Sequence, residues 1–108
     1  MNQRDKLLKL HQQMCLEALE VMKKKNHDYA GKEGTDPYAN FRRVETMGIC
    51  STLQGFLVRL TDKLSRLSTF VKDGELLVKD ETVRDTLIDM INYPILLQGF
   101  LDDQKEGR

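Results

Sequence analysis

Apolar residues recur at helical spacing along most of this 108-residue sequence, and no stretch alternates strictly between apolar and polar positions as a half-buried strand does. Polar stretches rich in turn formers separate the apolar segments. The pattern therefore predicts an all-α fold, a small helical bundle of three long helices and one short helix. The predicted helices span residues 2–25, 37–47, 51–72 and 81–100, with a loop over 26–36, a connection over 73–80 and a frayed polar tail over 102–108.

Short-range signals bound the middle two helices. Asp36 and Pro37 fit the N-cap and the first helical position of the short helix. Ser51 and Gln54 have the spacing of a capping box at the start of the third helix. Gly74 fits the glycine that follows a helix in the left-handed conformation, so we expect the third helix to end there.

The third helix carries the strongest apolar stripe of the chain. Its members repeat every three or four residues over five turns, which predicts a face packed in the core. The stripe consists of Leu53, Phe56, Leu57, Leu60, Leu64, Leu67 and Val71. A polar row on the same helix contains Arg59, Asp62, Lys63 and Arg66. This row fits a solvated face, a basic counterpart to acidic residues of another helix, or a phosphate clamp.

The last helix mixes burial and charge in an unusual way. It is apolar almost all round, which is typical of a helix buried on most sides. Even so, Glu81, Asp85, Asp89 and Asn92 share one face, because they follow one another at i, i+4, i+8 and i+11. Unpaired carboxylates are rarely buried. This acidic stripe therefore either meets basic partners from another helix or faces a ligand or metal site.

Composition narrows the function classes. Seventeen basic and seventeen acidic residues cancel, so no global charge attracts nucleic acid or an anionic membrane. The two cysteines are far apart and form no CxxC motif, which fits reduced thiols in a cytoplasmic protein. No apolar run approaches the 18 residues of a membrane-spanning helix. We expect one domain over 1–108. A short chain buries a small fraction of its surface, so we also expect a homo-oligomer, with a dimer favoured, through the apolar stripe of the first helix (His11, Met14, Met22) or through the last helix.

Four short motifs then suggest a family. KNHDYAG, YANF, DKLSRL and LIDMINY follow one another between about residue 25 and residue 100, and together they resemble the phage-associated nucleotide-modification-associated domain family of the first type. The resemblance implies a small all-α protein of phage or mobile-element origin tied to nucleotide metabolism, located in the cytoplasm of the bacterial host. The matching residues are Lys25, Asp28, Tyr29, Asn40, Phe41, Lys63, Arg66, Asp85, Asp89, Asn92 and Tyr93.

The chain is more distantly similar to the all-α nucleotide pyrophosphatases of the MazG type. Their final metal-binding helix also has acidic residues followed by apolar ones. Their preceding helix, however, carries an acidic E-E-x-x-E motif, where this chain has Asp62, Lys63 and Arg66. Because this chain has a lysine and an arginine where those enzymes have acidic metal ligands, the difference favours phosphate binding over hydrolysis.

Three hypotheses follow. The first is a protein that binds a nucleotide or nucleotide-derived ligand without turnover, in nucleotide modification or in sequestering a host immune nucleotide signal. The second is an Mg²⁺-dependent nucleoside triphosphate pyrophosphohydrolase in which Glu81, Asp85 and Asp89 act and Asp85 and Asp89 bind the metal. The third is a helical interaction protein without a small ligand. The ligand-binding residues of the first hypothesis are Lys25, Asp28, Tyr29, Asn40, Arg59, Lys63, Arg66, Asp85, Asp89 and Asn92.

Overall fold

The structure, a computed structural model, describes residues 1–29, 36–74 and 82–107, with the side chains of residues 27–29 excepted. Within these ranges there are four helices and no strand, which confirms the all-α fold of three long helices and one short helix. None of the described helices is both long enough and apolar enough to cross a membrane. The helices are α1 (Gln3–Tyr29), α2 (Ala39–Thr46), α3 (Thr52–Asp73) and α4 (Val83–Lys105).

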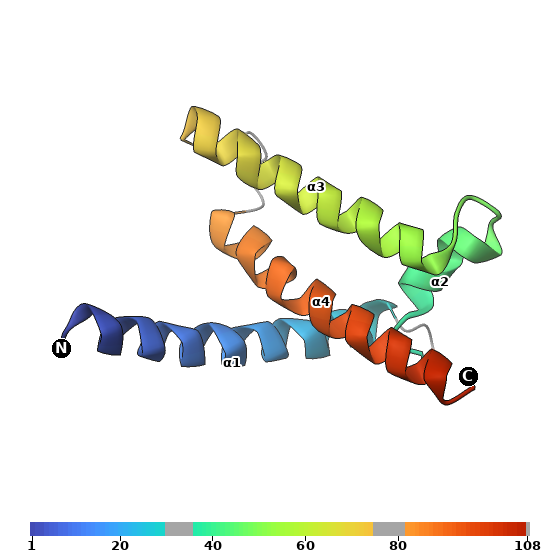
Figure 1. The fold of residues 1–108 in the computed structure, drawn as a ribbon, viewed down its shortest axis with the longest axis horizontal. Helices are drawn as coiled ribbons and strands as arrows, with labels where there is room; N and C mark the ends of the chain where they lie inside the picture. Colours follow the sequence, from blue (N-terminus) through green and yellow to red (C-terminus); the bar gives the residue numbers. More distant parts are fainter. Residues whose placement is uncertain (30–35, 75–81, 108) are drawn as a thin grey trace.

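The arrangement is open rather than a closed bundle. Helix α4 lies between α1 and α3 and packs against both, and α2 packs against α3 near its N-terminal end (Figure 1). The N-terminal half of α1 extends beyond α4 (Figure 1), and residues 1–13 are all exposed. Only the C-terminal half of α1 therefore takes part in the contact with α4.

The predicted helix ends of α3 are confirmed. The Ser51 hydroxyl accepts a hydrogen bond from the Gln54 backbone N–H at 3.1 Å, and the Gln54 side chain accepts one from the Ser51 N–H at 2.9 Å. These two bonds form the capping box. Gly74 ends the helix with φ 78°, and its N–H donates to the Phe70 carbonyl at 2.8 Å.

Three other boundaries differ from the prediction. Helix α1 continues to Tyr29, so the first part of the predicted loop is helical. The polar residues after Lys25 have lower helix propensities than alanine or leucine, but the difference is under about 1 kcal/mol per residue, which is too small to end the helix at residue 26. Helix α4 begins at Val83 instead of 81, because Thr82 is its N-cap. It ends at Lys105, so most of the predicted frayed tail is helical. There a Gln98–Asp102 side-chain hydrogen bond of 2.9 Å supports the last turns.

The start of α2 is also corrected. Asp36 was predicted as the N-cap, but the residue before the first helical position is Tyr38. The Asp36 carboxylate instead accepts a hydrogen bond from the Tyr38 N–H at 2.9 Å, two residues on. Such a bond closes a turn through Pro37, and the helix starts only after it, at Ala39.

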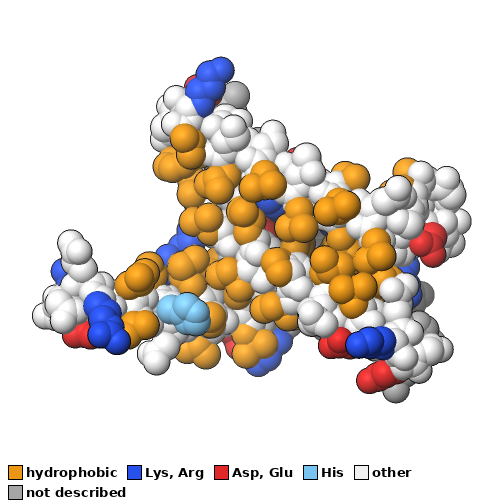
Figure 2. Space-filling model, viewed as in Figure 1, with side chains coloured by type: hydrophobic (Ala, Val, Ile, Leu, Met, Phe, Trp, Pro, Cys, Tyr) orange, Lys and Arg blue, Asp and Glu red, His pale blue; other side chains and the backbone are white. Residues whose placement is uncertain are grey.

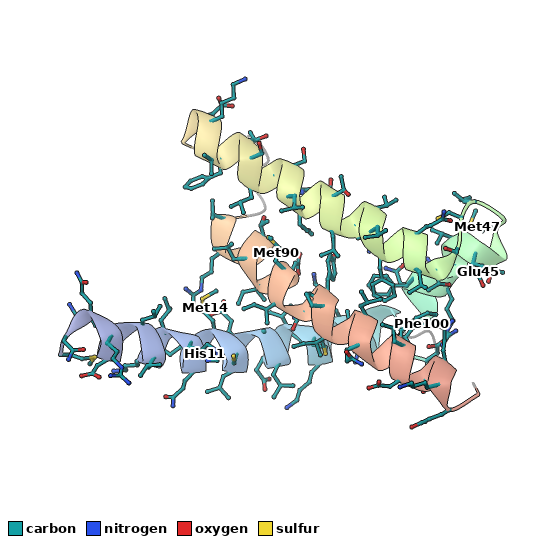
Figure 3. All side chains as sticks on the ribbon, viewed as in Figure 1. His11, Met14, Glu45, Met47, Met90 and Phe100 are labelled. Atoms are coloured by element: carbon teal, nitrogen blue, oxygen red, sulfur yellow. The ribbon has the colours of Figure 1, made fainter. Side chains whose placement is uncertain are left out.

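An aromatic core joins α2, α3 and α4. Phe41 of α2 stacks on Phe56 of α3 with ring centroids 4.0 Å apart, and its ring meets Tyr93 of α4 edge-on at 6.0 Å. Phe100, on α4 close to α2 (Figure 3), completes the buried cluster. Tyr38, Leu60, Leu96 and Leu97 pack around it, half-buried. Offset and edge-to-face contacts of this kind are favourable arrangements for aromatic rings.

The apolar stripe predicted for the core of α3 is only partly used by the chain itself. Phe56 is 1% exposed, but Leu57 is 63% exposed and Val71 is 78% exposed. Leu53 and Leu64 are exposed as well. The reason is geometric: α3 meets α4 through the face that holds Phe56 and Lys63, about a quarter of a turn from the leucine stripe. The prediction that the whole stripe lies in the core is wrong for this single chain.

Candidate functional site

Asp89 of α4 is the centre of the charged part of the structure. Its side chain is buried, and its two carboxylate oxygens contact two different helices. Lys25 of α1 donates to Oδ1 at 2.9 Å, and the Lys63 ammonium of α3 lies 2.9 Å from Oδ2. At this position the acidic stripe of α4 therefore meets basic partners, as one of the two interpretations of the sequence predicted.

The two lysines keep Asp89 ionised. Burial raises the pKa of the Asp89 carboxyl, but the hydrogen bonds and charges of Lys25 and Lys63 together outweigh burial and hold this pKa below its usual value. Lys63 is itself largely buried, whereas the Lys25 side chain is 41% exposed. The carboxylate therefore holds one ammonium inside the fold and one at its surface.

The lowered pKa of Asp89 predicts a loss of stability in acid. A carboxyl whose pKa is lower in the folded than in the unfolded state stabilises the fold fully above its unfolded pKa, which is about 4 for aspartate, and this contribution disappears as the pH falls through the folded value. We expect the free energy of unfolding in urea to fall between about pH 5 and pH 2, and to fall less steeply in Asp89→Asn. Equal slopes in the two proteins would contradict the pairing.

A small pocket opens beside Asp89. It has a volume of ≈ 60 Å³ and lies where the C-terminal part of α1, the start of α2, α3 and α4 come together. Five residues predicted from the sequence as ligand-binding line it together, although they are scattered over more than sixty positions of the chain. These are Lys25, Asn40, Arg59, Asp89 and Asn92. Met22, Asn26, Pro37, Phe41, Tyr93 and Leu96 complete the wall.

Arg59 is fixed on one side of this pocket. Its guanidinium lies over the ring of Phe41, 4.8 Å from the ring centroid, in a cation–π contact. With the Asn40 amide turned so that its oxygen faces the guanidinium, Oδ1 accepts two hydrogen bonds from Arg59, at 2.7 and 3.2 Å. A guanidinium has five N–H donors, so it has capacity for an anion in addition to these two bonds.

Asn92 has a structural contact on the other side. Its amide nitrogen donates a hydrogen bond of 2.9 Å to the backbone carbonyl of Ala18 in α1, and both residues are buried. A buried amide that loses such a partner costs roughly 1–3 kcal/mol. Asn92 therefore ties α4 to α1 beside the two lysine contacts of Asp89.

Residues 50–98, which hold α3 and most of α4, match the sequence model of a known family, described as nucleotide modification associated domain 1. This segment is similar to the nucleotide modification associated family over these residues, which make up a little less than half of the chain. The resemblance predicted from the motifs is thereby confirmed. A search of curated proteins and a search of solved structures found no match.

Within the matched segment of this domain, two predicted site residues have local partners instead. Arg66 contacts Asp62, four residues earlier on α3, at 3.2 Å. Asp85 is exposed and caps α4: its carboxylate accepts a hydrogen bond from the Thr82 N–H at 2.9 Å, and the Thr82 hydroxyl accepts one from the Asp85 N–H at 3.1 Å. Neither residue lines the pocket beside Asp89.

In the part of the chain that the structure describes, Asp85 and Asp89 are poorly arranged to bind Mg²⁺ as predicted from the sequence. Both oxygens of Asp89 are held by ammonium groups, and Asp85 is engaged in the capping box. Among the described residues, no three histidine, cysteine or acidic side chains gather as metal ligands. Glu81 and the side chains of Asp28 and Tyr29 lie outside the described residues. Binding of Mg²⁺ therefore stays a prediction from the sequence.

Sequence reasoning missed part of the apolar wall. Met22 was assigned to an oligomer contact, and Pro37 to a helix start, yet both line the pocket. Met22 could have been found, because it precedes Lys25 by three residues and so lies on the same face of α1. For Pro37 and Leu96 we see no local signal, because only the packing of α2 against the other helices places them there.

Proposed function

We propose that this protein binds a nucleotide-type ligand at the pocket beside Asp89, with its phosphate groups towards Lys25 and Arg59, which line the pocket. The observation that carries the proposal is the local charge. Lys25 and Arg59 line the pocket with Asp89, and Lys63 pairs with the same carboxylate without lining the pocket, so these described side chains carry three positive charges and one negative charge in a chain whose formal net charge is zero. An excess of positive charge at a pocket attracts anions over short distances.

The cations are also held in place before a ligand arrives. Asp89 fixes the two lysine ammoniums, and Phe41 and Asn40 fix the guanidinium of Arg59. Groups that are already ordered lose little conformational entropy on binding. Arginine is suited to phosphate because its planar fork can donate two parallel hydrogen bonds to it.

The volume of the pocket limits what can be enclosed. Sites that bury a drug-sized ligand usually have about 300–1,000 Å³, whereas this pocket has ≈ 60 Å³. The proposal therefore places a phosphate group in the pocket and leaves the sugar and base largely outside it. Base stacking on Tyr29, as predicted from the sequence, belongs to a side chain outside the described residues.

Binding without turnover is favoured over hydrolysis because Lys25 and Lys63 already contact the two carboxylate oxygens of Asp89. A metal ion that catalysed phosphoanhydride cleavage would need carboxylate oxygens, and each oxygen of Asp89 faces an ammonium. A domain of this kind could serve nucleotide modification as a carrier, or sequester a host immune nucleotide signal. Both roles need a bound phosphate and no cleavage.

We expect at least one member of a panel of nucleoside mono-, di- and triphosphates and cyclic nucleotides to raise the melting temperature. For that ligand, Lys25→Gln and Arg59→Gln should each weaken binding about 10- to 100-fold in calorimetry, since a charged hydrogen bond to phosphate contributes about 1.5–3 kcal/mol. Arg84→Gln is the matched control. It removes one positive charge from the surface, where Arg84 pairs with Glu17 at 2.7 Å, and should leave binding unchanged.

Three outcomes would contradict this proposal. The absence of any shift across the panel would favour a helical interaction protein without a small ligand. An equal loss of affinity in Arg84→Gln would point to general charge attraction rather than a site. Release of pyrophosphate from a bound triphosphate in the presence of Mg²⁺ would favour the pyrophosphohydrolase.

A further inference from the structure

The outer face of α3 is exposed and carries no charge from Leu53 to Val71. Seen down the helix, nine neighbouring positions within an arc of about 140° are all exposed, and each is apolar or neutral. We call this face the uncharged strip. It consists of Leu53, Gln54, Leu57, Val58, Thr61, Leu64, Ser65, Ser68 and Val71.

Most charges of α3 lie elsewhere on the helix. Up to Val71, its charged residues are Arg59, Asp62, Lys63 and Arg66, and all four fall in the arc opposite the uncharged strip or facing α4. Lys72, in the last turn, is the next charged residue and falls within the arc of the strip at its C-terminal end. Exposed surfaces of soluble proteins rarely hold a large apolar area free of charge. Depletion of charged residues is the compositional mark of the core of a protein interface.

The apolar residues along this face also have the spacing of a helix–helix seam. Steps of four and three residues alternate without a break over nearly three heptads, which is the repeat by which one helix packs lengthwise against another. The seam residues are Leu53, Leu57, Leu60, Leu64, Leu67 and Val71. Among the described residues the seam is covered on one side only: Leu60 and Leu67 are half-buried, whereas Leu57, Leu64 and Val71 are 63%, 54% and 78% exposed.

The surface area of the chain indicates how large the missing contact is. A compact monomer of 12.5 kDa would expose about 6,200 Å², whereas this chain exposes 8166 Å². The excess of about 2,000 Å² lies within the roughly 1,000–2,500 Å² that each chain buries in an obligate homodimer. The radius of gyration, 15.9 Å against about 13 Å for a compact domain of this length, shows the same excess.

The exposed apolar surface continues from α3 to the other long helices. Hydrophobic side chains gather over α1, α4 and α3 on one face of the molecule, with few charged atoms among them (Figure 2). On α1, Leu7 and Leu8 are 65% and 55% exposed, on the half of the helix that extends beyond α4. A helix of this length without a packing partner is marginal in water, so this half also needs a contact.

We propose that a second copy of this chain covers the uncharged strip of α3, so that the protein is a homodimer. A second copy fits because the strip has no charge between Leu53 and Val71 to repel its own image, and a two-fold axis brings identical faces together. The excess area of the chain is large enough for one such interface. This inference does not depend on nucleotide binding.

The test is the mass of the protein in solution, measured by light scattering and sedimentation. We expect about twice 12.5 kDa for the wild-type chain at micromolar concentration. Leu57→Lys, and separately Thr61→Arg, should give the mass of one chain, with helical content preserved because both side chains are exposed. The matched control is Ile49→Lys, an exposed apolar residue before α3, which should stay dimeric.

Two results would overturn the proposal. A wild-type monomer up to hundreds of micromolar would leave the strip to a partner of another kind. Dimeric mass in both Leu57→Lys and Thr61→Arg would place the contact between copies on a different face. Thr61→Arg keeps the leucine seam intact, so it remains informative if Leu57→Lys fails to fold.

Discussion

Asp89→Asn is expected to lower the free energy of unfolding by about 3 kcal/mol, because removing one partner of a buried ion pair leaves the other charge uncompensated. The stranded charge is mainly that of Lys63, whose side chain is only 11% exposed. Lys25 reaches solvent and contributes less. Urea denaturation at neutral pH and one fixed protein concentration measures the change.

Asp85→Asn provides the control on the same helix. Asp85 is also a carboxylate, four residues before Asp89, but it is exposed and its bonds cap the helix. Its replacement should cost no more than about 1 kcal/mol. The double variant Asp89→Leu with Lys63→Met should recover part of the loss, since a buried pair can often be replaced by apolar residues. Equal losses in the two single variants would show that Asp89 is not paired inside the fold.

Phe56→Ala is expected to cost about 4 kcal/mol, the largest effect of any single change considered for this domain. Phe56 is 1% exposed, stacks on Phe41 at 4.0 Å and lies 5.9 Å from Phe100, so its removal leaves a cavity between α2, α3 and α4. Native domains have only about 5–15 kcal/mol of stability in total. The variant should therefore be close to unfolding, as seen in urea denaturation followed by circular dichroism.

The matched control for this change is Phe70→Ala. Phe70 lies on the same helix and is half-buried, so it loses less apolar contact when truncated. We expect its loss of stability to be less than half that of Phe56→Ala. If the two variants lost the same free energy, the aromatic cluster would not be the core of the domain.

The sequence predicted the helices well because their signals are local. The capping box at Ser51 and Gln54 and the glycine at 74 depend on neighbours within four residues, and both are confirmed. The start of α4 could have been found in the same way, since Thr82 and Asp85 have the spacing of a capping box. The leucine stripe of α3 was misplaced because periodicity shows which face is apolar and not which element covers it.

The site was predicted only in part, for a similar reason. Lys25 and Asp89 are 64 residues apart, so no local pattern joins them. Only two signals in the sequence relate to this pairing: the acidic stripe of the last helix needs basic partners, and both residues belong to the motifs of the family resemblance. Arg66 and Asp85 do not line the pocket, and each contacts a partner nearby in the sequence, Asp62 or Thr82, so their role in ligand binding stays a prediction. Local contacts cost less chain entropy to form than distant ones.

The most direct measurement of ligand binding at the pocket is nuclear magnetic resonance of the isotope-labelled domain, titrated with the nucleotide that gives the largest thermal shift. The predicted result is a set of saturable shifts in the backbone amide signals around Lys25, Asn40, Arg59 and Asp89, which line one pocket from four helices. Those shifts should be absent in Arg59→Gln and present in Arg84→Gln. Saturable shifts confined to other parts of the chain, or shifts that persist unchanged in Arg59→Gln, would contradict binding at this pocket.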